Sequence, residues 1–188
     1  SRTLLTAGAT ERPVAFENND RPGIMLAGAM RSYANRWAVT PGQKVAVFTN
    51  NDDGLRTAVD LAAKGVTIAA VIDSRTDATP LEGFNHLRGA LVVNSRGRLG
   101  LREISVRLAD GSLQKIACDA LGVSGGWNPN VQLTCHQRGR PVWDDTLAAF
   151  VPGGSLPTGM SVAGAAMGDM TTAGALVSGA RAAMEALE

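Results

Sequence analysis

The hydrophobic pattern is clearest in the second quarter of the chain. Residues 44–48 (KVAVF) form a short apolar run typical of a buried strand, and residues 49–54 (TNNDDG) follow as a polar turn. Residues 55–65 then carry apolar side chains at helical spacing before a terminal glycine: Leu55, Ala58, Val59 and Ala62. Residues 66–73 (VTIAAVID) are a second apolar run. Strand, turn, helix and strand in this order predict a βαβ unit with parallel strands.

Weaker patterns elsewhere complete the expected set of elements. Residues 24–39 have helical spacing, with four positions expected in the core: Met25, Ala29, Tyr33 and Trp37. Residues 81–91 are expected to hold a short helix. Alternating apolar residues over 101–118 predict a β-hairpin with a two-residue turn at Asp110-Gly111. A short strand and a helix of small residues over 172–187 are expected to close the chain.

The turn at residues 49–54 departs from the dinucleotide-binding fingerprint. That fingerprint is Gly-x-Gly-x-x-Gly, with an acid about 20 residues further on that binds a ribose hydroxyl. When Gly54 is aligned with the third glycine, Thr49 and Asn51 replace the first two, and Asp73 takes the place of the acid. Asp52 and Asp53 at the start of the helix are expected to cap its N–H groups and to repel a phosphate. Two interpretations compete, an NAD site at Gly54 and Asp73 or a capped unit without a ligand, and these residues favour the second.

Composition adds few indications of chemistry. A chain of 188 residues is long enough for one large domain or two small ones. The formal charge is +1 with scattered basic residues, so nothing indicates binding to nucleic acid or to an anionic membrane. No apolar run is long enough to span a bilayer and no signal peptide opens the chain, so we expect a cytoplasmic location.

Individual cysteines and histidines do not indicate a catalytic or metal site. Cys118 and Cys135 lack the spacing of a zinc site, and free thiols are expected for both. His86 and His136 have no nucleophile nearby in the sequence and are interpreted as surface or packing residues. Arg75 follows the acid at 73 and could meet a 2′-phosphate, although a solvated loop arginine is the simpler interpretation.

The chain opens directly on a strand (RTLLTAG, residues 2–8) with no preceding element. A strand of a parallel sheet needs neighbours, so we expect the chain to be a segment of a larger protein from which an N-terminal portion is missing.

Several longer stretches together resemble a known family. TAGATERP (6–13), NNDRPGIM (18–25), CDALGVSGGWNPN (118–130), WDDTLAAFVPG (143–153) and VAGAA (162–166) occur in the order seen in flavoproteins with two dinucleotide-binding domains. In detail they are similar to the α subunits of heterotetrameric sarcosine oxidases, and the resemblance covers nearly the whole chain.

The resemblance implies an α/β fold, namely a Rossmann-like FAD/NAD(P)-binding domain with a parallel sheet and an antiparallel β-hairpin layer. It implies an inserted NAD-type domain at residues 14–140, and an incomplete outer dinucleotide-binding domain made of residues 1–13 and 141–188. Gly8, Gly125 and Gly164 match outer-domain positions that line the cofactor. In the wider family an aspartate follows the last of these glycines; here Ala165 stands in that place, so the role of the nearby Asp169 is open. This departure fits NAD better than FAD.

The resemblance also implies a function. The complete subunit would carry NAD, and the assembled complex would carry FAD or FMN, oxidise sarcosine with peroxide formation and pass the one-carbon unit to tetrahydrofolate. The expected partners are the other sarcosine oxidase subunits. No residue has the setting of a nucleophile or hydride-transfer base, so we expect the segment alone to be non-catalytic and to bind no dinucleotide tightly. Two alternatives remain, namely a free-standing NAD(P)-dependent reductase domain and a structural module that positions partner subunits.

Overall fold

The computed structural model describes residues 2–185, and within them the chain divides into two compact units. Unit 2 consists of residues 11–126, and unit 1 of the described parts of residues 1–10 and 127–188. The sequence of unit 2 thus lies between the two segments of unit 1. The expected domain bounds, 14–140 for an inserted domain and 1–13 with 141–188 for an outer one, remain a prediction. That either unit is a dinucleotide-binding domain remains a prediction.

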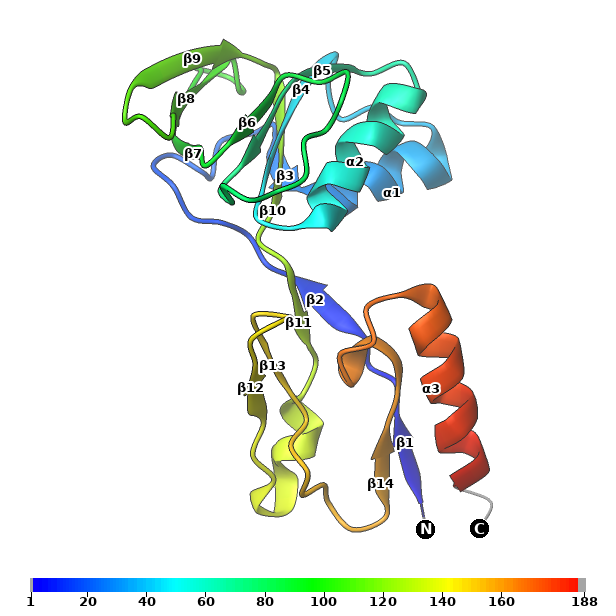
Figure 1. The fold of residues 1–188 in the computed structure, drawn as a ribbon. Helices are drawn as coiled ribbons and strands as arrows, with labels where there is room; N and C mark the ends of the chain where they lie inside the picture. The colour runs from blue at the N-terminus through cyan, green and yellow to red at the C-terminus, as the bar shows by residue number, and fades with distance from the viewer. Residues whose placement is uncertain (1, 186–188) are drawn as a thin grey trace. The chain divides into compact units, whose positions relative to one another are not determined.

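Unit 2 is built on a parallel five-stranded sheet (Figure 1). Its strands, in spatial order, are β3 (Ile24–Leu26), β10 (Ala120–Ser124), β4 (Lys44–Thr49), β5 (Thr67–Asp73) and β6 (His86–Arg88). Every neighbouring pair in this sheet is parallel. The predicted βαβ unit is therefore confirmed as β4, α2 and β5.

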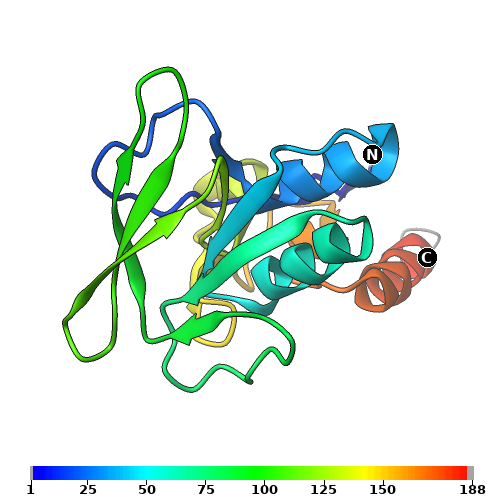
Figure 2. The ribbon, with the colours of Figure 1, turned by 90° about the horizontal axis from the view of Figure 1, so that it is seen from above.

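A second sheet covers one face of the first (Figure 2). Its antiparallel strands are β7 (Leu91–Arg96), β8 (Glu103–Arg107) and β9 (Leu113–Ala117). The main core lies between the two sheets and is made of apolar side chains from both, including Phe48, Ile72, Ile104 and Leu121. The expected antiparallel layer is thus confirmed, with three strands.

Helices α1 (Ala27–Trp37) and α2 (Asp52–Ala63) cover the other face, so unit 2 has three layers (Figure 2). The expected helix over residues 24–39 begins only at Ala27, because residues 24–26 pair with β10 as strand β3. Its buried face also differs from the prediction: Ala27, Met30 and Ala34 are buried, whereas Tyr33 and Trp37 are exposed and contact each other. Small side chains let α1 lie close to the sheet.

The inward face of α2 was predicted only in part. Leu55 and Ala58 are buried as expected, but Leu61 completes the face and Val59 is exposed. Thr57 and Gly54 are buried on this face as well, and the missing side chain of Gly54 leaves room for the neighbouring strand.

Two local predictions in unit 2 are wrong. The expected helix over 81–91 is absent from that part of the structure, because residues 86–88 extend the parallel sheet as β6. The hairpin of β8 and β9 is present, but its turn is longer than two residues. The N–H of Leu108 donates to the carbonyl of Ser112, and Gly111 takes a positive φ of 85°.

Unit 1 is made of short elements around a small core. Strands β1 (Thr3–Leu5) and β14 (Met160–Val162) pair in parallel, and β12 (Val142–Asp144) and β13 (Ala149–Val151) form an antiparallel hairpin. The remaining elements are β2 (Ala9–Glu11), whose last residue belongs to unit 2 and which pairs with β11 (Trp127–Pro129), the 3-10 helices η1 (Gln132–Arg138) and η2 (Gly164–Ala166), and the helix α3 (Thr172–Glu185). The core joins Leu5, Val162 and Ala166. The closing strand and helix are confirmed up to residue 185; the last residues predicted for the helix, 186 and 187, lie outside the described residues.

Candidate functional site

The carboxyl edge of the parallel sheet in unit 2 is where an open α/β fold binds its ligand. Three of its strands end there in mutual contact. The N–H of Asn50, after β4, donates to the carbonyl of Ser124 at the end of β10 (3.3 Å), and the N–H of Ser74, after β5, donates to the carbonyl of Thr49 (3.0 Å). The candidate residues Gly54, Asp73 and Gly125 all lie at this edge.

The N-terminus of α2 is capped by Asn51. Its side-chain oxygen accepts hydrogen bonds from the N–H groups of Asp53 (3.0 Å) and Gly54 (3.2 Å). Its amide nitrogen donates to the hydroxyl of Ser124 (3.1 Å), which holds the cap in place. The expectation that Asp52 and Asp53 cap the helix is therefore wrong, because they lie inside its first turn, whereas Asn51 holds the extended N-cap position from which a side chain reaches these N–H groups.

Gly54 brings the helix close to strand β4. A Cβ at this position would lie 2.2 Å from Oγ1 and 2.5 Å from Cβ of Thr49, which is far inside van der Waals contact. Thr49 is itself fully buried, and its hydroxyl donates to the carbonyl of Asn51 (2.9 Å). The glycine thus performs the packing role of the third glycine in a dinucleotide-binding turn.

Asp73 is fully buried at the end of β5 and is held by Arg75. The guanidinium donates to both carboxylate oxygens, at 3.1 Å from Nε and 2.8 Å from Nη2, and the N–H of Arg75 donates to Oδ1 at 2.9 Å. Nη1 of Arg75 also pairs with Asp52 at the start of α2 (2.9 Å). These hydrogen bonds, led by that with Asp73, raise the pKa of Arg75. The interpretation of Arg75 as a solvated loop residue is therefore wrong.

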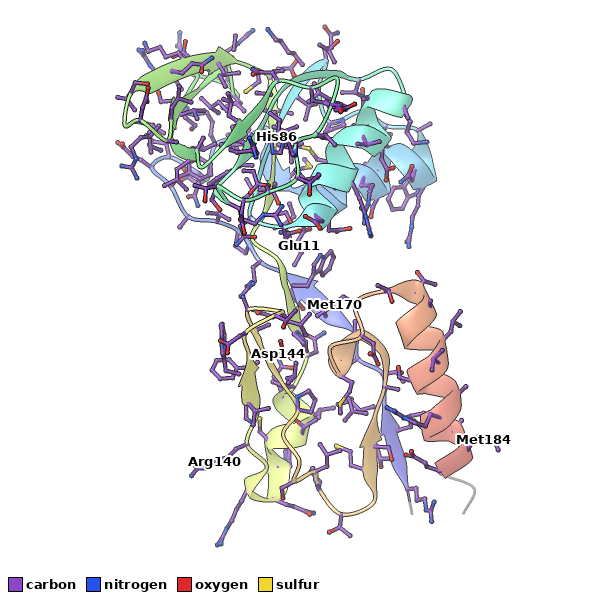
Figure 3. All side chains as sticks on the ribbon, viewed as in Figure 1. Glu11, His86, Arg140, Asp144, Met170 and Met184 are labelled. Carbon is purple, nitrogen blue, oxygen red and sulfur yellow. The ribbon has the colours of Figure 1, made fainter. Side chains whose placement is uncertain are left out.

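Two further titratable side chains at this edge, Asp53 and His86, also have partners within unit 2. Asp53 pairs with Arg31 of α1 (2.9 Å). The His86 side chain is buried (Figure 3), and its Nδ1 accepts a hydrogen bond from the N–H of Leu81 (3.0 Å). Burial lowers the pKa of His86, and its Nε2 lies 3.8 Å from Asp73. His86 is a packing residue, as one of the two expected roles had it.

Gly125 follows β10 and lies against the incoming chain of unit 2. A Cβ there would lie 3.0 Å from the carbonyl oxygens of both Arg12 and Pro13. The N–H of Gly125 donates to the carbonyl of Arg12 (2.7 Å). Close approach of two backbones therefore accounts for a glycine here.

The other candidate residues lie together in unit 1. Gly8 and Gly164 follow the carboxyl ends of the paired strands β1 and β14, and both have positive φ, 71° and 68°. The N–H of Gly164 donates to the hydroxyl of Ser178 (3.0 Å), and the N–H of Asp169 donates to the carbonyl of Gly164 (3.2 Å). Unit 1 thus brings Gly8, Gly164 and Asp169 to one edge of a parallel pair.

The edge of unit 2 does not fit a dinucleotide. A pyrophosphate would need the N–H groups at the start of α2, and Asn51 already occupies two of them. A ribose would need the carboxylate of Asp73, and Arg75 binds both of its oxygens. The side chains of this unit therefore take the positions that ligand groups would take.

The part of the chain that the structure describes contains neither a cluster of metal-ligating side chains nor a helix that could cross a membrane. Within residues 2–185, no three His, Cys, Asp or Glu side chains gather as they would around a metal ion. None of the helices described combines the length and apolar character needed to cross a bilayer.

The roles of three residues in unit 2 were not predicted from the sequence, namely those of Asn51, Arg75 and Glu11. Asn51 was treated only as a replaced glycine, although an asparagine directly before a helix is a frequent N-cap and signals that role. The partner of Arg75, Asp73, is two residues away in the sequence, so an ion pair between them could have been predicted from the Asp-x-Arg spacing. Glu11 acts on a helix 17 residues downstream, through its contact with Gly28, and no local signal reveals it.

Comparison with known proteins gives close relatives along nearly the full sequence. The chain is 43% identical over 185 residues to sarcosine oxidase subunit alpha of Rhizobium meliloti (strain 1021), which covers 95% of the chain and 18% of the relative. It is 40% identical over 193 residues to the subunit of the same name from Corynebacterium sp. (strain P-1), covering 96% of the chain and 20% of the relative. No family profile matches the chain. The chain thus spans about a fifth of the length of these relatives.

Solved structures share the fold. Thioredoxin reductase from T. acidophilum superposes with a TM-score of 0.73 at 14% identity, covering 97% of this chain and 64% of that one. L-proline dehydrogenase from P. horikoshii superposes with a TM-score of 0.65 at 23% identity, covering 88% and 30%. The predicted Rossmann-like FAD/NAD(P)-binding fold is confirmed. The chain is related, over nearly its whole length, to a segment of the sarcosine oxidase alpha subunits.

Proposed function

We propose that this chain is the dinucleotide-domain segment of a sarcosine oxidase alpha subunit. The complete subunit would bind NAD, and the assembled complex, with its FAD or FMN, would demethylate sarcosine to glycine with formation of peroxide and transfer of the one-carbon unit to tetrahydrofolate. The partners would be the other subunits of that oxidase, in the cytoplasm. The 40–43% identity to three such subunits is the observation that carries the proposal.

Within this function the two units have different tasks. Unit 1 supplies Gly8, Gly164 and Asp169 to the dinucleotide of the complete subunit, which is supported by their common position at one edge of β1 and β14. Unit 2 is a scaffold that keeps the Rossmann form without a ligand. Asn51 on the α2 N-terminus and Arg75 on Asp73 support this division.

The activity is tested on the full-length subunit that carries this segment. Co-expressed with its partner subunits, it is expected to give sarcosine-dependent oxygen consumption with stoichiometric peroxide. A Gly164→Val variant, which adds a side chain at a positive φ, should lower the NAD content of the purified complex. An assembled complex that does not oxidise sarcosine would refute the proposal.

The ligand-free state of the segment has its own test. Calorimetric titration of the 188-residue chain with NAD should give no binding in the micromolar range. Micromolar binding that is abolished by Asp73→Ala or Gly54→Val would instead support the alternative of a free-standing NAD(P)-dependent reductase domain. A purely structural module would be supported if the full-length subunit assembles with its partners but purifies without any dinucleotide.

A further inference from the structure

Helix α1 begins without a cap of its own. Leu26 at the N-cap position offers no side-chain acceptor, and the first turn contains no acidic residue. The first N–H groups of a helix have no partner within the helix and need an acceptor from elsewhere. That acceptor comes from the incoming chain of unit 2, where Oε2 of Glu11 accepts a hydrogen bond from the N–H of Gly28 at 2.9 Å.

Glu11 is an unusual choice for this position because it is buried. The residue is 7% exposed and lies where the chain enters unit 2 (Figure 3). Its second oxygen, Oε1, makes no well-formed hydrogen bond with any residue between 2 and 185, although the Ser124 hydroxyl is near enough to favour the charged form. A buried carboxylate with an unsatisfied oxygen is costly, and a neutral acid avoids most of that cost.

The charges around Glu11 do not offset its burial. Arg31 of α1 favours the carboxylate, but Asp53 of α2 opposes it, and these two form an ion pair with each other. Burial therefore raises the pKa of Glu11 above its ordinary value of 4.5, against the smaller effects of Ser124 and Gly28. Because the pKa is raised in the folded chain, the stabilisation is complete below 4.5 and is lost as the pH rises through the folded pKa.

Glu11 is also the first residue of the segment where the chain enters unit 2, and this segment pairs with the one where the chain leaves it. The N–H of Arg12 donates to the carbonyl of Gly126 (2.8 Å), and the N–H of Gly125 donates to the carbonyl of Arg12 (2.7 Å). The incoming residues 11–13 and the outgoing residues 124–126 thus form one paired structure, called the clasp below. The hydrogen bond from Gly28 to the Glu11 side chain attaches this clasp to the start of α1.

We propose that Glu11 is a proton-sensitive anchor of the clasp, which holds residues 11–13 against helix α1 more tightly as a neutral acid than as a carboxylate. When the segment opens, a carboxylate regains its hydration, whereas a neutral acid gains much less. The clasp therefore opens more often as the pH rises. This inference does not depend on the proposed function, because it concerns only contacts within unit 2.

Amide hydrogen exchange, followed by NMR on the complete chain from about pH 4.5 to pH 8, tests the anchor. The readouts are the protection factors of Gly28, which donates to Glu11, and Arg12, which donates to Gly126. Glu11→Gln keeps an acceptor without the charge and should raise both protection factors severalfold at the upper pH, with little effect at the lower one. Glu11→Ala removes the acceptor and should lower the protection of Gly28 about fivefold at both pH values.

Glu82→Gln is the matched control, because Glu82 is exposed in the same unit and should leave both amides unchanged. The anchor is overturned if Glu11→Gln protects these amides no better than the natural chain at the upper pH. It is equally overturned if Glu11→Ala leaves Gly28 unchanged, or if the control shifts both amides as much as Glu11→Gln does.

Discussion

The two units differ in the size of their hydrophobic cores and in how many of their polar edge groups are paired within the unit. Unit 2 has a core between two sheets and a second apolar layer under its helices, and its ligand edge is filled by Asn51 and Arg75. In its described part, unit 1 has short strands and a small core around Leu5, Val162 and Ala166, and large apolar side chains are exposed on α3 and on the β12–β13 hairpin: Leu176, Val177, Met184, Trp143 and Phe150. The unit whose edge side chains pair with one another thus has the larger core, whereas the unit that holds Gly8, Gly164 and Asp169 has the smaller one.

The largest expected contrast between the units is in thiol reactivity. Burial raises the pKa of Cys118 in unit 2 to about 12, whereas Cys135 in unit 1 is exposed. At about pH 8 the thiolate fraction of Cys118 falls by about three orders of magnitude relative to an ordinary thiol, and the buried sulfur is also inaccessible. Alkylation with iodoacetamide, read by peptide mass spectrometry, should label Cys135 within minutes and leave Cys118 unlabelled. Equal labelling of both in the folded chain would contradict the burial of Cys118.

Truncation of buried leucines should show the difference in core size. Leu121 is fully buried in the main core of unit 2, and Leu121→Ala is expected to cost about 3–5 kcal/mol. Leu5 is buried in the small core of unit 1, where fewer neighbours would surround a cavity, so Leu5→Ala should cost about 2 kcal/mol. Hydrogen exchange of peptides from each unit measures both costs separately. Leu99→Ala, at a side chain 92% exposed, is the control that should change neither unit.

The next largest difference is expected in how much an ion pair of each unit contributes to stability. Arg75→Ala leaves the fully buried carboxylate of Asp73 without its guanidinium, and we expect a loss of about 2 kcal/mol or more. Arg181→Ala in α3 removes an exposed pair with Glu185 at 3.9 Å and should cost less than about 0.5 kcal/mol. Urea unfolding of the two variants measures the difference. Equal, small losses would mean that Asp73 finds another partner or water.

Arg75 also shows where sequence reasoning stops. The hydrophobic pattern predicted β4, α2 and β5, because strand and helix periods are local properties of the chain. It could not predict β6 in place of a helix at 81–91, because a three-residue strand exists only through its pairing with β5. Nor did the pattern separate residues that bind a ligand from residues that pair within the chain. Gly54 and Asp73 lie where a dinucleotide site would have them, but the N–H of Gly54 donates to Asn51, and the carboxylate of Asp73 accepts from Arg75.

The same limit applies to burial. Tyr33 and Trp37 were expected in the core from their spacing, yet the small residues Ala27 and Ala34 face the sheet and the aromatic rings face outward. The spacing of a helix gives its period but not which side is inward. That choice was made by close packing against β10, where a Cβ on Gly122 would lie 3.0 Å from the sulfur of Met30.

The smallest contrast concerns two glycines inside helices, and it tests how closely α2 packs against β4. Gly54 in α2 has no room for a Cβ, which would lie 2.2 Å from Thr49 Oγ1, so Gly54→Ala should destabilise unit 2 by about 1–2 kcal/mol. Gly179 in α3 has open space where a Cβ would lie, with no described atom within 4 Å, so Gly179→Ala should stabilise unit 1 by about 0.5–1 kcal/mol through helix propensity alone. Both changes replace a helical glycine by alanine, so we expect the close contact with Thr49 to give Gly54→Ala the opposite sign. Thermal unfolding followed by circular dichroism, with hydrogen exchange to assign the unit, gives both signs. If Gly54→Ala also stabilises, then α2 can move away from β4, and the closed edge of unit 2 is less rigid than its contacts indicate.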